Sequence, residues 1–270
     1  MPTLARTDAV LHYEIDGAGD AVVLLGGFSQ HSHDRVMTVL RGLFARQYRV
    51  ICVDHRGAGQ TTITPHTRAS ADIMADDIAA VLDHEGIEAA HTLGISMGGI
   101  VSNMLALRHP ARLRSQVIAV SLAYVPPHNR TNFMLETLRL LRDQGVPLDL
   151  INRVGAGMLF GESVFEQEAY IQAVIHAPAD PHVQTRQGFD LLMDGLKTLD
   201  LRPHLAAIRT PTLVMSSPDD VLAPPHHQQA LAAGIPGAAI RHYPGGHLFM
   251  ALPSQIGPFV QDVSAFWNAH

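Results

Sequence analysis

Short apolar runs of strand length alternate with helical patterns along the first half of the chain. The predicted strands cover residues 10–15, 21–25, 49–53, 92–95 and 116–122. Between them, residues 36–45, 70–84 and 97–108 carry apolar side chains at helical spacing. Continuous apolar strands that alternate with helices predict an α/β fold, with a mostly parallel sheet covered by helices on both faces.

The strand pattern stops near Val125 and returns at Thr212. The intervening segment contains only predicted helices, over residues 131–143, 148–159, 164–175 and 181–196. The last part adds strands over 212–216 and 238–243 and helices over 226–233 and 256–268. We therefore expect a core of residues 1–124 and 206–270, interrupted by a helical insertion of residues 125–205. An insertion of this size above a sheet is typical of a lid, and the alternative is an insertion that only completes the core.

Composition narrows the class of protein. The 270 residues are 47% apolar and 16% charged, which is typical of a globular chain with a large core. A net charge of −6 without a basic cluster argues against nucleic-acid binding. The single cysteine, Cys52, excludes an internal disulfide, and its apolar surroundings predict a buried thiol.

The sequence predicts no membrane contact. The N-terminal residues lack the apolar segment of a signal peptide, and no run approaches 18 apolar residues. We expect a cytoplasmic protein, either a monomer or a homodimer.

The segment Gly94-Ile95-Ser96-Met97-Gly98 reads G-x-S-x-G between a predicted strand and a predicted helix. On such a turn the serine backbone is strained, and the glycines leave room for strand and helix to approach each other. The hydroxyl is then exposed above the sheet edge, near the positive end of the helix. This position suits a nucleophile. The alternative is a glycine-rich turn with a structural role only.

A serine nucleophile needs a base, usually histidine, and a carboxylate that orients it. Ligands of parallel sheets lie outside the carboxyl ends of the strands, so these partners belong on loops after strands. The last two predicted strands are followed by Asp219-Asp220 and by His247. No Asp or Glu occurs between Ser96 and Glu136, which leaves Asp219 or Asp220 as the acid.

Five segments carry a resemblance to a known family. They are LLGGF at 24–28, VDHRGAG at 53–59, GISMGG at 94–99, PTLV at 211–214 with DDVLAP at 219–224, and PGGH at 244–247. Over nearly its whole length the chain resembles α/β-hydrolase fold enzymes. Within that superfamily it is similar to small bacterial enol-lactonases, aminoacrylate-type hydrolases and methylesterases.

The resemblance implies a triad of Ser96, Asp220 and His247. It favours Asp220 over Asp219 because the acid of such enzymes stands four residues before the proline that matches Pro224. It also implies a small-molecule substrate and no cofactor or metal.

The resemblance further implies an oxyanion hole made by the backbone N–H groups of Phe28 and Met97. One departure is that Gly26-Gly27 stands where many relatives have His-Gly. We expect that difference to reshape the loop without removing catalysis.

We expect the substrate pocket to involve the oxyanion loop, the insertion and the histidine loop. The candidate lining residues are Gly27, His31, Arg130, Met134, Phe160, Phe189, Met193 and Leu248. Arg130 would hold a substrate carboxylate or remain solvated. The His31-x-His33 pair lacks a third ligand at usable spacing, so no metal site is expected. The segment at residues 54–57 is interpreted as a loop that braces a strand end.

The sequence thus predicts a hydrolase of an ester, lactone or related acyl bond. The same fold also hosts C–C bond hydrolases, lyases and cofactor-free oxygenases, and these remain the alternative. A non-catalytic protein that binds a small ligand is the third hypothesis.

Overall fold

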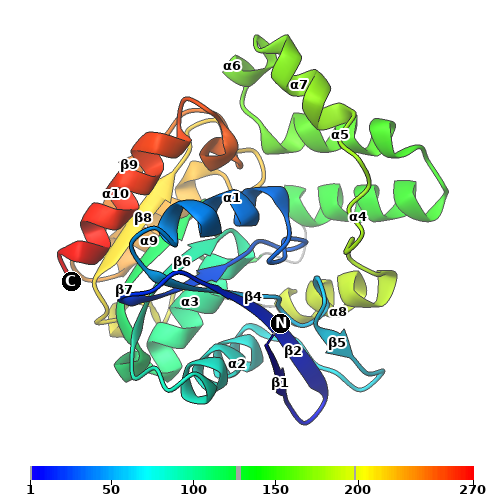
Figure 1. Ribbon diagram of the computed structural model, residues 1–270. Helices are drawn as coiled ribbons and strands as arrows, with labels where there is room; N and C mark the ends of the chain where they lie inside the picture. Colours follow the sequence, from blue (N-terminus) through cyan, green and yellow to red (C-terminus); the bar gives the residue numbers. More distant parts are fainter. Residues whose placement is uncertain (1, 126–128, 198) are drawn as a thin grey trace.

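A mostly parallel sheet forms the centre of the computed structural model, which describes residues 2–125, 129–197 and 199–270 (Figure 1). The strands are β1 (Thr3–Ala5), β2 (Ala9–Asp16), β3 (Ala21–Leu25), β4 (Arg49–Val53), β5 (Thr62–Ile63), β6 (Ala90–Ile95), β7 (Leu113–Ala119), β8 (Thr212–Ser216) and β9 (Ala239–His242). Their order is β1-β2-β4-β3-β6-β7-β8-β9, with β5 paired to β2. The pairs from β4 to β9 are parallel, and β2 pairs antiparallel with β1, β4 and β5. The predicted α/β fold is confirmed.

Helices cover both faces of this sheet. They are α1 (Arg35–Phe44) and α10 (Ile256–Asn268) on one face, and α2 (Ala71–His84), α3 (Met97–Arg108) and α9 (Pro225–Gly234) on the other. The short 3₁₀ turns are η1 (Pro110–Arg112), η2 (Leu205–Ala207) and η3 (Phe249–Ala251). On the α1 and α10 face, the buried ring of Trp267 lies 4.9 Å from that of Phe44, centroid to centroid. Burial of apolar side chains on both faces stabilises the sheet.

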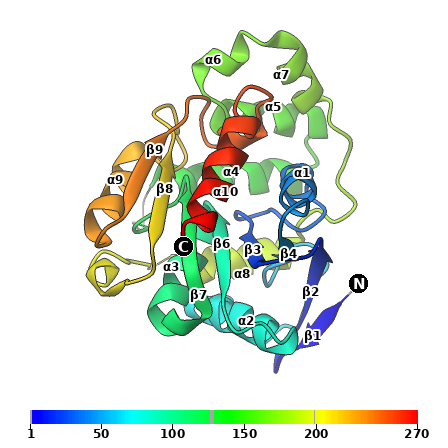
Figure 2. The same ribbon diagram turned by 60° about the vertical axis from the view of Figure 1, so that its left-hand side comes forward.

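The inserted helices, which we define as α4 to α8, follow β7. They are α4 (Arg130–Asp143), α5 (Leu148–Leu159), α6 (Glu162–Phe165), α7 (Glu168–Ile175) and α8 (Arg186–Leu196). Both views place α4 to α7 together beyond one end of the sheet (Figures 1 and 2). Part of the insertion forms a separate apolar cluster that also includes Leu252 of the core, whereas Leu192 and Leu196 of α8 pack into the main core.

Some predicted elements differ from the structure. The strand predicted over residues 116–122 ends at Ala119, because Val120 adopts a left-handed backbone with φ of 46°. The single helix predicted over 164–175 is two helices, α6 and α7, and α8 begins at Arg186. Ser70 occupies the N-cap position of α2, but its side chain makes no capping hydrogen bond. The predicted break at residues 125–127 lies partly outside the described residues.

Cys52, the single cysteine of the chain, is buried. Burial raises the pKa of the Cys52 thiol, as expected for a thiol inside β4. In the part of the chain that the structure describes, no helix has the length and hydropathy of a membrane span.

Candidate active site

Ser96 lies on the turn between β6 and α3, in a strained backbone conformation. Its φ is 53° and its ψ is −116°, a combination that side-chain-bearing residues rarely adopt. A Cβ at Gly94 would lie 2.4 Å from the carbonyl oxygen of Gly98, and one at Gly98 would lie 2.0 Å from that of Leu25. The predicted need for small residues on both sides of the serine is therefore confirmed. Strain of this kind costs about 1–3 kcal/mol and is held by surrounding contacts.

Those contacts come from the end of β7 and the segment after it. The Ser96 N–H donates to the carbonyl of Ala119 at 2.9 Å, and the Ser121 hydroxyl donates to the carbonyl of Ser96 at 2.7 Å. α3 begins at Met97, so the Met97 N–H belongs to the first turn, whose N–H groups have no partner within the helix. The turn therefore presents a hydroxyl and a helix N-terminus at the same place.

His247 and Asp220 are in direct contact. Their Nδ1 and Oδ2 atoms are 2.8 Å apart, and the side chains are 7% and 0% exposed. The other carboxylate oxygen, Oδ1, accepts the N–H groups of Leu222 and Ala223, each at 2.9 Å. Asp219 is exposed, and its carboxylate accepts the Gly245 N–H at 3.3 Å. Of the two candidate acids, Asp220 is the one that contacts the histidine.

The loop that carries His247 is bound to the inserted helices. The Leu248 N–H donates to the carbonyl of Leu159 at the end of α5, at 2.9 Å. The Gly161 N–H donates to the carbonyl of Gly245 at 3.0 Å. Gly246 has a φ of 87°, and a Cβ there would lie 2.4 Å from the Gly161 nitrogen. The end of α5 and the histidine loop therefore position each other.

The loop after β3 lies against Ser96. A Cβ on Gly27 would lie 3.4 Å from the Ser96 Cβ. The Gln30 side chain accepts the Gly27 N–H at 2.8 Å, and the Gln30 N–H donates to the Gly27 carbonyl at 3.1 Å. Within the described residues, no hydrogen bond engages the Phe28 N–H. That N–H is free to bind an oxygen in the adjoining cavity, which Phe28 lines.

A cavity of about 290 Å³ opens beside Ser96 and His247. Its lining residues from the core include Gly27, Phe28, Met97, Leu222 and Leu248. Those from the inserted helices are Thr131, Asn132, Leu135, Leu138, Gly155, Met158, Leu159, Met193 and Leu196. The described residues that line it include one carboxylate, Asp34, and neither lysine nor arginine. Burial raises the pKa of the Asp34 carboxyl. The cavity lining is thus mainly apolar.

The expected pocket residues divide into two groups. Gly27, Met193 and Leu248 line the cavity, but His31, Arg130, Met134, Phe160 and Phe189 are not among its lining residues.

Each of these five has another environment. His31 is buried, and its Nε2 lies 2.8 Å from a carboxylate oxygen of Asp180. Phe160 belongs to the apolar cluster inside the insertion, and Phe189 packs its ring edge-on against that of Phe28. Arg130 is exposed, and Met134 is half-buried on α4 and is not among the residues that line the cavity.

The sequence reasoning missed most of the lining on α4 and α5. Thr131, Leu135 and Leu138 follow the spacing i, i+4, i+7, which marks one face of a helix. Leu138, Met158 and Leu159 also border the cavity. The helical spacing of Thr131, Leu135 and Leu138 indicates that they share one face of the helix. It does not show what that face contacts.

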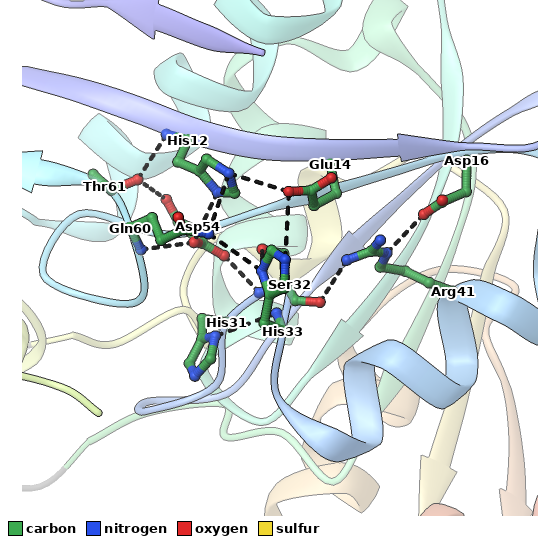
Figure 3. A network of polar contacts seen from close by, with 10 residues as sticks. All are labelled: His12, Glu14, Asp16, His31, Ser32, His33, Arg41, Asp54, Gln60 and Thr61. Carbon is green, nitrogen blue, oxygen red and sulfur yellow. Dashed lines mark hydrogen bonds and ion pairs between the residues drawn. The ribbon is translucent and has the colours of Figure 1, made fainter. Parts of the chain in front are cut away.

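Asp54, at the end of β4, connects several loops near the site (Figure 3). One oxygen lies 3.0 Å from His12 Nδ1 and accepts the Gln60 N–H at 2.8 Å. The other oxygen accepts the N–H of Ser32, which follows the loop that carries Phe28. His33 reaches Glu14 at 3.7 Å in the same network. The interpretation of residues 54–57 as a brace agrees with these contacts.

The described residues contain no group of three or more His, Cys, Asp or Glu side chains arranged to hold a metal ion.

Comparisons with known proteins give matches over most of the chain. A family model described as alpha/beta hydrolase fold matches residues 20–156. The chain is 33% identical, over 95% of each sequence, to a protein of Azorhizobium caulinodans named "Putative carbamate hydrolase RutD". It superposes on a hydrolase from Pseudomonas aeruginosa PA01 with a TM-score of 0.81 at 26% identity, covering 98% of this chain and 97% of the other. An enol-lactonase from Burkholderia xenovorans LB400 gives a TM-score of 0.81 at 23% identity, covering 98% and 99%. The likeness therefore includes the inserted helices as well as the sheet.

Proposed function

Because the chain belongs to the alpha/beta hydrolase fold family, we propose that it is a serine hydrolase acting on an ester or lactone bond of a small molecule. The observation that carries the proposal is the 2.8 Å contact between His247 Nδ1 and Asp220 Oδ2, beside a cavity that Ser96 and His247 both line. The catalytic residues in this proposal are Ser96, His247 and Asp220.

The proposed first half-reaction forms an acyl-enzyme. When Nδ1–H of His247 donates to Asp220, Nε2 carries the lone pair that accepts the Ser96 proton. The Ser96 oxygen then bonds to the substrate carbonyl carbon, and the negative charge moves to the carbonyl oxygen. The N–H groups of Phe28 and Met97 would stabilise that charge, which is worth about 3 kcal/mol per donor in such sites.

Collapse of this tetrahedral species breaks the bond to the leaving oxygen, which takes the proton from His247 Nε2. Water then repeats the sequence on the acyl-enzyme, with His247 as the base, and releases the acid. The chemistry requires neither a metal nor a cofactor.

The charge and polarity of the cavity lining limit the candidate substrates. The name of the curated relative makes a carbamate the second candidate. A free carbamate is a small anion and calls for a cationic partner, whereas the described lining has no lysine or arginine and includes Asp34. An uncharged ester or lactone with an apolar group suits this lining better.

The inserted helices would act as a lid in this proposal, since α4, α5 and α8 supply much of the cavity lining. A lid that excludes water strengthens the electrostatic interactions at the serine and protects the acyl-enzyme.

The test is treatment with a fluorophosphonate probe, followed by intact-mass measurement of the wild type and of Ser96→Ala. We expect a single adduct on the wild type and none on the variant, with turnover of ester and lactone panels reduced by several orders of magnitude in the variant. Folded wild type that forms no adduct and turns over no ester would refute the proposal. It would favour proton-transfer, oxygenase or pure binding roles, which oxygen uptake and ligand screens would separate.

A further inference from the structure

Helix α5 contains two glycines near its C-terminal end, Gly155 and Gly157. Glycine inside a helix is less favourable than alanine by about 1 kcal/mol, so its presence there needs a reason. Neither residue has a left-handed backbone, and apart from its chain neighbours and the backbone of its own helix, a Cβ at either position would meet no heavy atom within 4 Å. Conformational freedom and close packing therefore explain neither glycine.

The two glycines differ in their surroundings. Gly157 is exposed, so the open space beside it is solvent. Gly155 is buried and lines the cavity, together with Met158 and Leu159 on the next turn. The open space beside Gly155 is therefore part of the cavity itself.

We propose that the missing side chain of Gly155 sets the length of the apolar acyl chain that the cavity admits. The inference rests on the proposed function, because it assigns the cavity between Ser96 and α5 to the acyl group. The lining that α4 and α5 supply is mainly apolar, with Leu135 and Leu138 of α4 and Met158 of α5 among its residues. The substrate class is accordingly an uncharged ester or lactone with an extended apolar acyl group. Gly155 acts as a specificity-determining residue in the part of the cavity wall that α5 supplies.

The expected effect of filling this space on kcat/KM follows from the number of carbon atoms that a substitution adds. The side chain of leucine has four carbon atoms and would occupy room that an acyl chain otherwise uses. Each buried methylene changes kcat/KM about fourfold, which corresponds to about 0.8 kcal/mol. Gly155→Leu should therefore lower the ratio of kcat/KM for p-nitrophenyl hexanoate to that for p-nitrophenyl acetate by about 10- to 100-fold. Gly155→Ala should lower the same ratio by about fourfold.

Gly157→Leu is the matched control, since it makes the same exchange in the same helix on the solvent side. We expect its hexanoate-to-acetate ratio to equal that of the wild type within twofold. Thermal unfolding of all variants identifies any that fail to fold, and Gly155→Ala keeps the test available if Gly155→Leu does not fold. An unchanged chain-length profile in folded Gly155→Leu, or an equal shift in Gly157→Leu, would overturn the inference.

A binding measurement separates this inference from the proposed function. The neutral fluorescent probe N-phenyl-1-naphthylamine is titrated into the wild type and both leucine variants. Weaker probe binding by Gly155→Leu alone, in a protein without esterase activity, would refute the proposed function and retain the assignment of the space beside Gly155. Equal probe binding by the wild type and Gly155→Leu would overturn that assignment. Ester turnover with identical chain-length profiles would overturn the inference while leaving the proposed function intact.

Discussion

Replacing Asp220 by asparagine keeps the size of the side chain but removes one hydrogen-bond acceptor. The carboxylate has three partners: Oδ1 accepts Leu222 N–H and Ala223 N–H, and Oδ2 faces His247 Nδ1. Asparagine has a single acceptor oxygen and an NH₂ group that only donates. In this buried position it must therefore satisfy one side at the expense of the other.

We expect the asparagine oxygen to keep its hydrogen bonds with the backbone N–H groups of Leu222 and Ala223. Turning the NH₂ group toward Leu222 and Ala223 would leave two buried N–H donors without an acceptor, at a cost of about 1–3 kcal/mol each. With the oxygen on the backbone N–H groups, the NH₂ group faces His247 Nδ1. The imidazole then adopts the tautomer with its proton on Nε2, which cannot accept the proton of Ser96. The same exchange in serine proteases of this constellation lowers kcat about 10⁴-fold, or about 5 kcal/mol, and we expect a similar loss here.

The assay is kcat and KM for a p-nitrophenyl ester, with urea unfolding as the measure of stability. We expect kcat to fall about 10⁴-fold and KM to change little. Asp219→Asn is the matched control because Asp219 is exposed and, among the residues that the structure describes, accepts one hydrogen bond, from the Gly245 N–H, which an amide oxygen can keep. Its kcat should stay within threefold of the wild type. Folded Asp220→Asn that retained a tenth of the wild-type kcat would refute the tautomer reasoning.

Two predictions concern stability. The side chains of Arg56 and Asp77 are each 4% exposed and form a double hydrogen bond, and Arg6 Nε also lies 3.0 Å from Asp77 Oδ1. Arg56→Gln should leave the buried Asp77 with only the partly exposed Arg6 of these two partners and lower the free energy of unfolding in urea by about 3 kcal/mol. The exposed Arg202→Gln should cost less than about 1 kcal/mol, and equal losses for the two variants would contradict the burial argument. The second prediction rests on buried histidines whose pKa values burial lowers from 6.5 to about 4. These are His55, His91 and His227. Below pH 6.5 the unfolded chain binds protons that these native side chains do not, so the free energy of unfolding should fall between pH 6.5 and pH 4. Urea titrations at several pH values measure this slope, and a flat profile over that range would count against it.

The sheet and the Ser96 turn could be predicted because their signals are local. A continuous apolar run fixes a buried strand, and the glycines around Ser96 follow from contacts within one strand-turn-helix unit. A contact of Asp219 or Asp220 with His247 could be anticipated because these residues follow strands whose carboxyl ends meet at one edge, whereas the preference for Asp220 came from the family resemblance. The short β1 and β5 escaped prediction, since three and two residues carry too little pattern.

The cavity lining could not be predicted to the same extent, because it depends on contacts between distant segments. His31 pairs with Asp180, which lies 149 positions along the chain, and this contact turns its imidazole to a partner outside the cavity. Phe189 contacts the ring of Phe28, from a helix whose periodicity indicates one apolar face without saying what it touches. Gln184 donates to the carbonyl oxygens of Phe28 and Gly57, although nothing in its own neighbourhood marks it for that role. Tertiary packing, rather than propensity, decides such orientations.

Trp267 is the only tryptophan of the chain, and its place under α1 makes it an optical reporter of one region. Its ring also lies 5.2 Å from that of Tyr48, centroid to centroid, on the sheet face that α1 and α10 cover. Tryptophan fluorescence will therefore report unfolding of the sheet. It will not change when the inserted helices move. A second indole at Phe133, which is 74% exposed on α4, would add a signal from the insertion. The difference between the two emission records would then separate opening of the insertion from unfolding of the whole molecule.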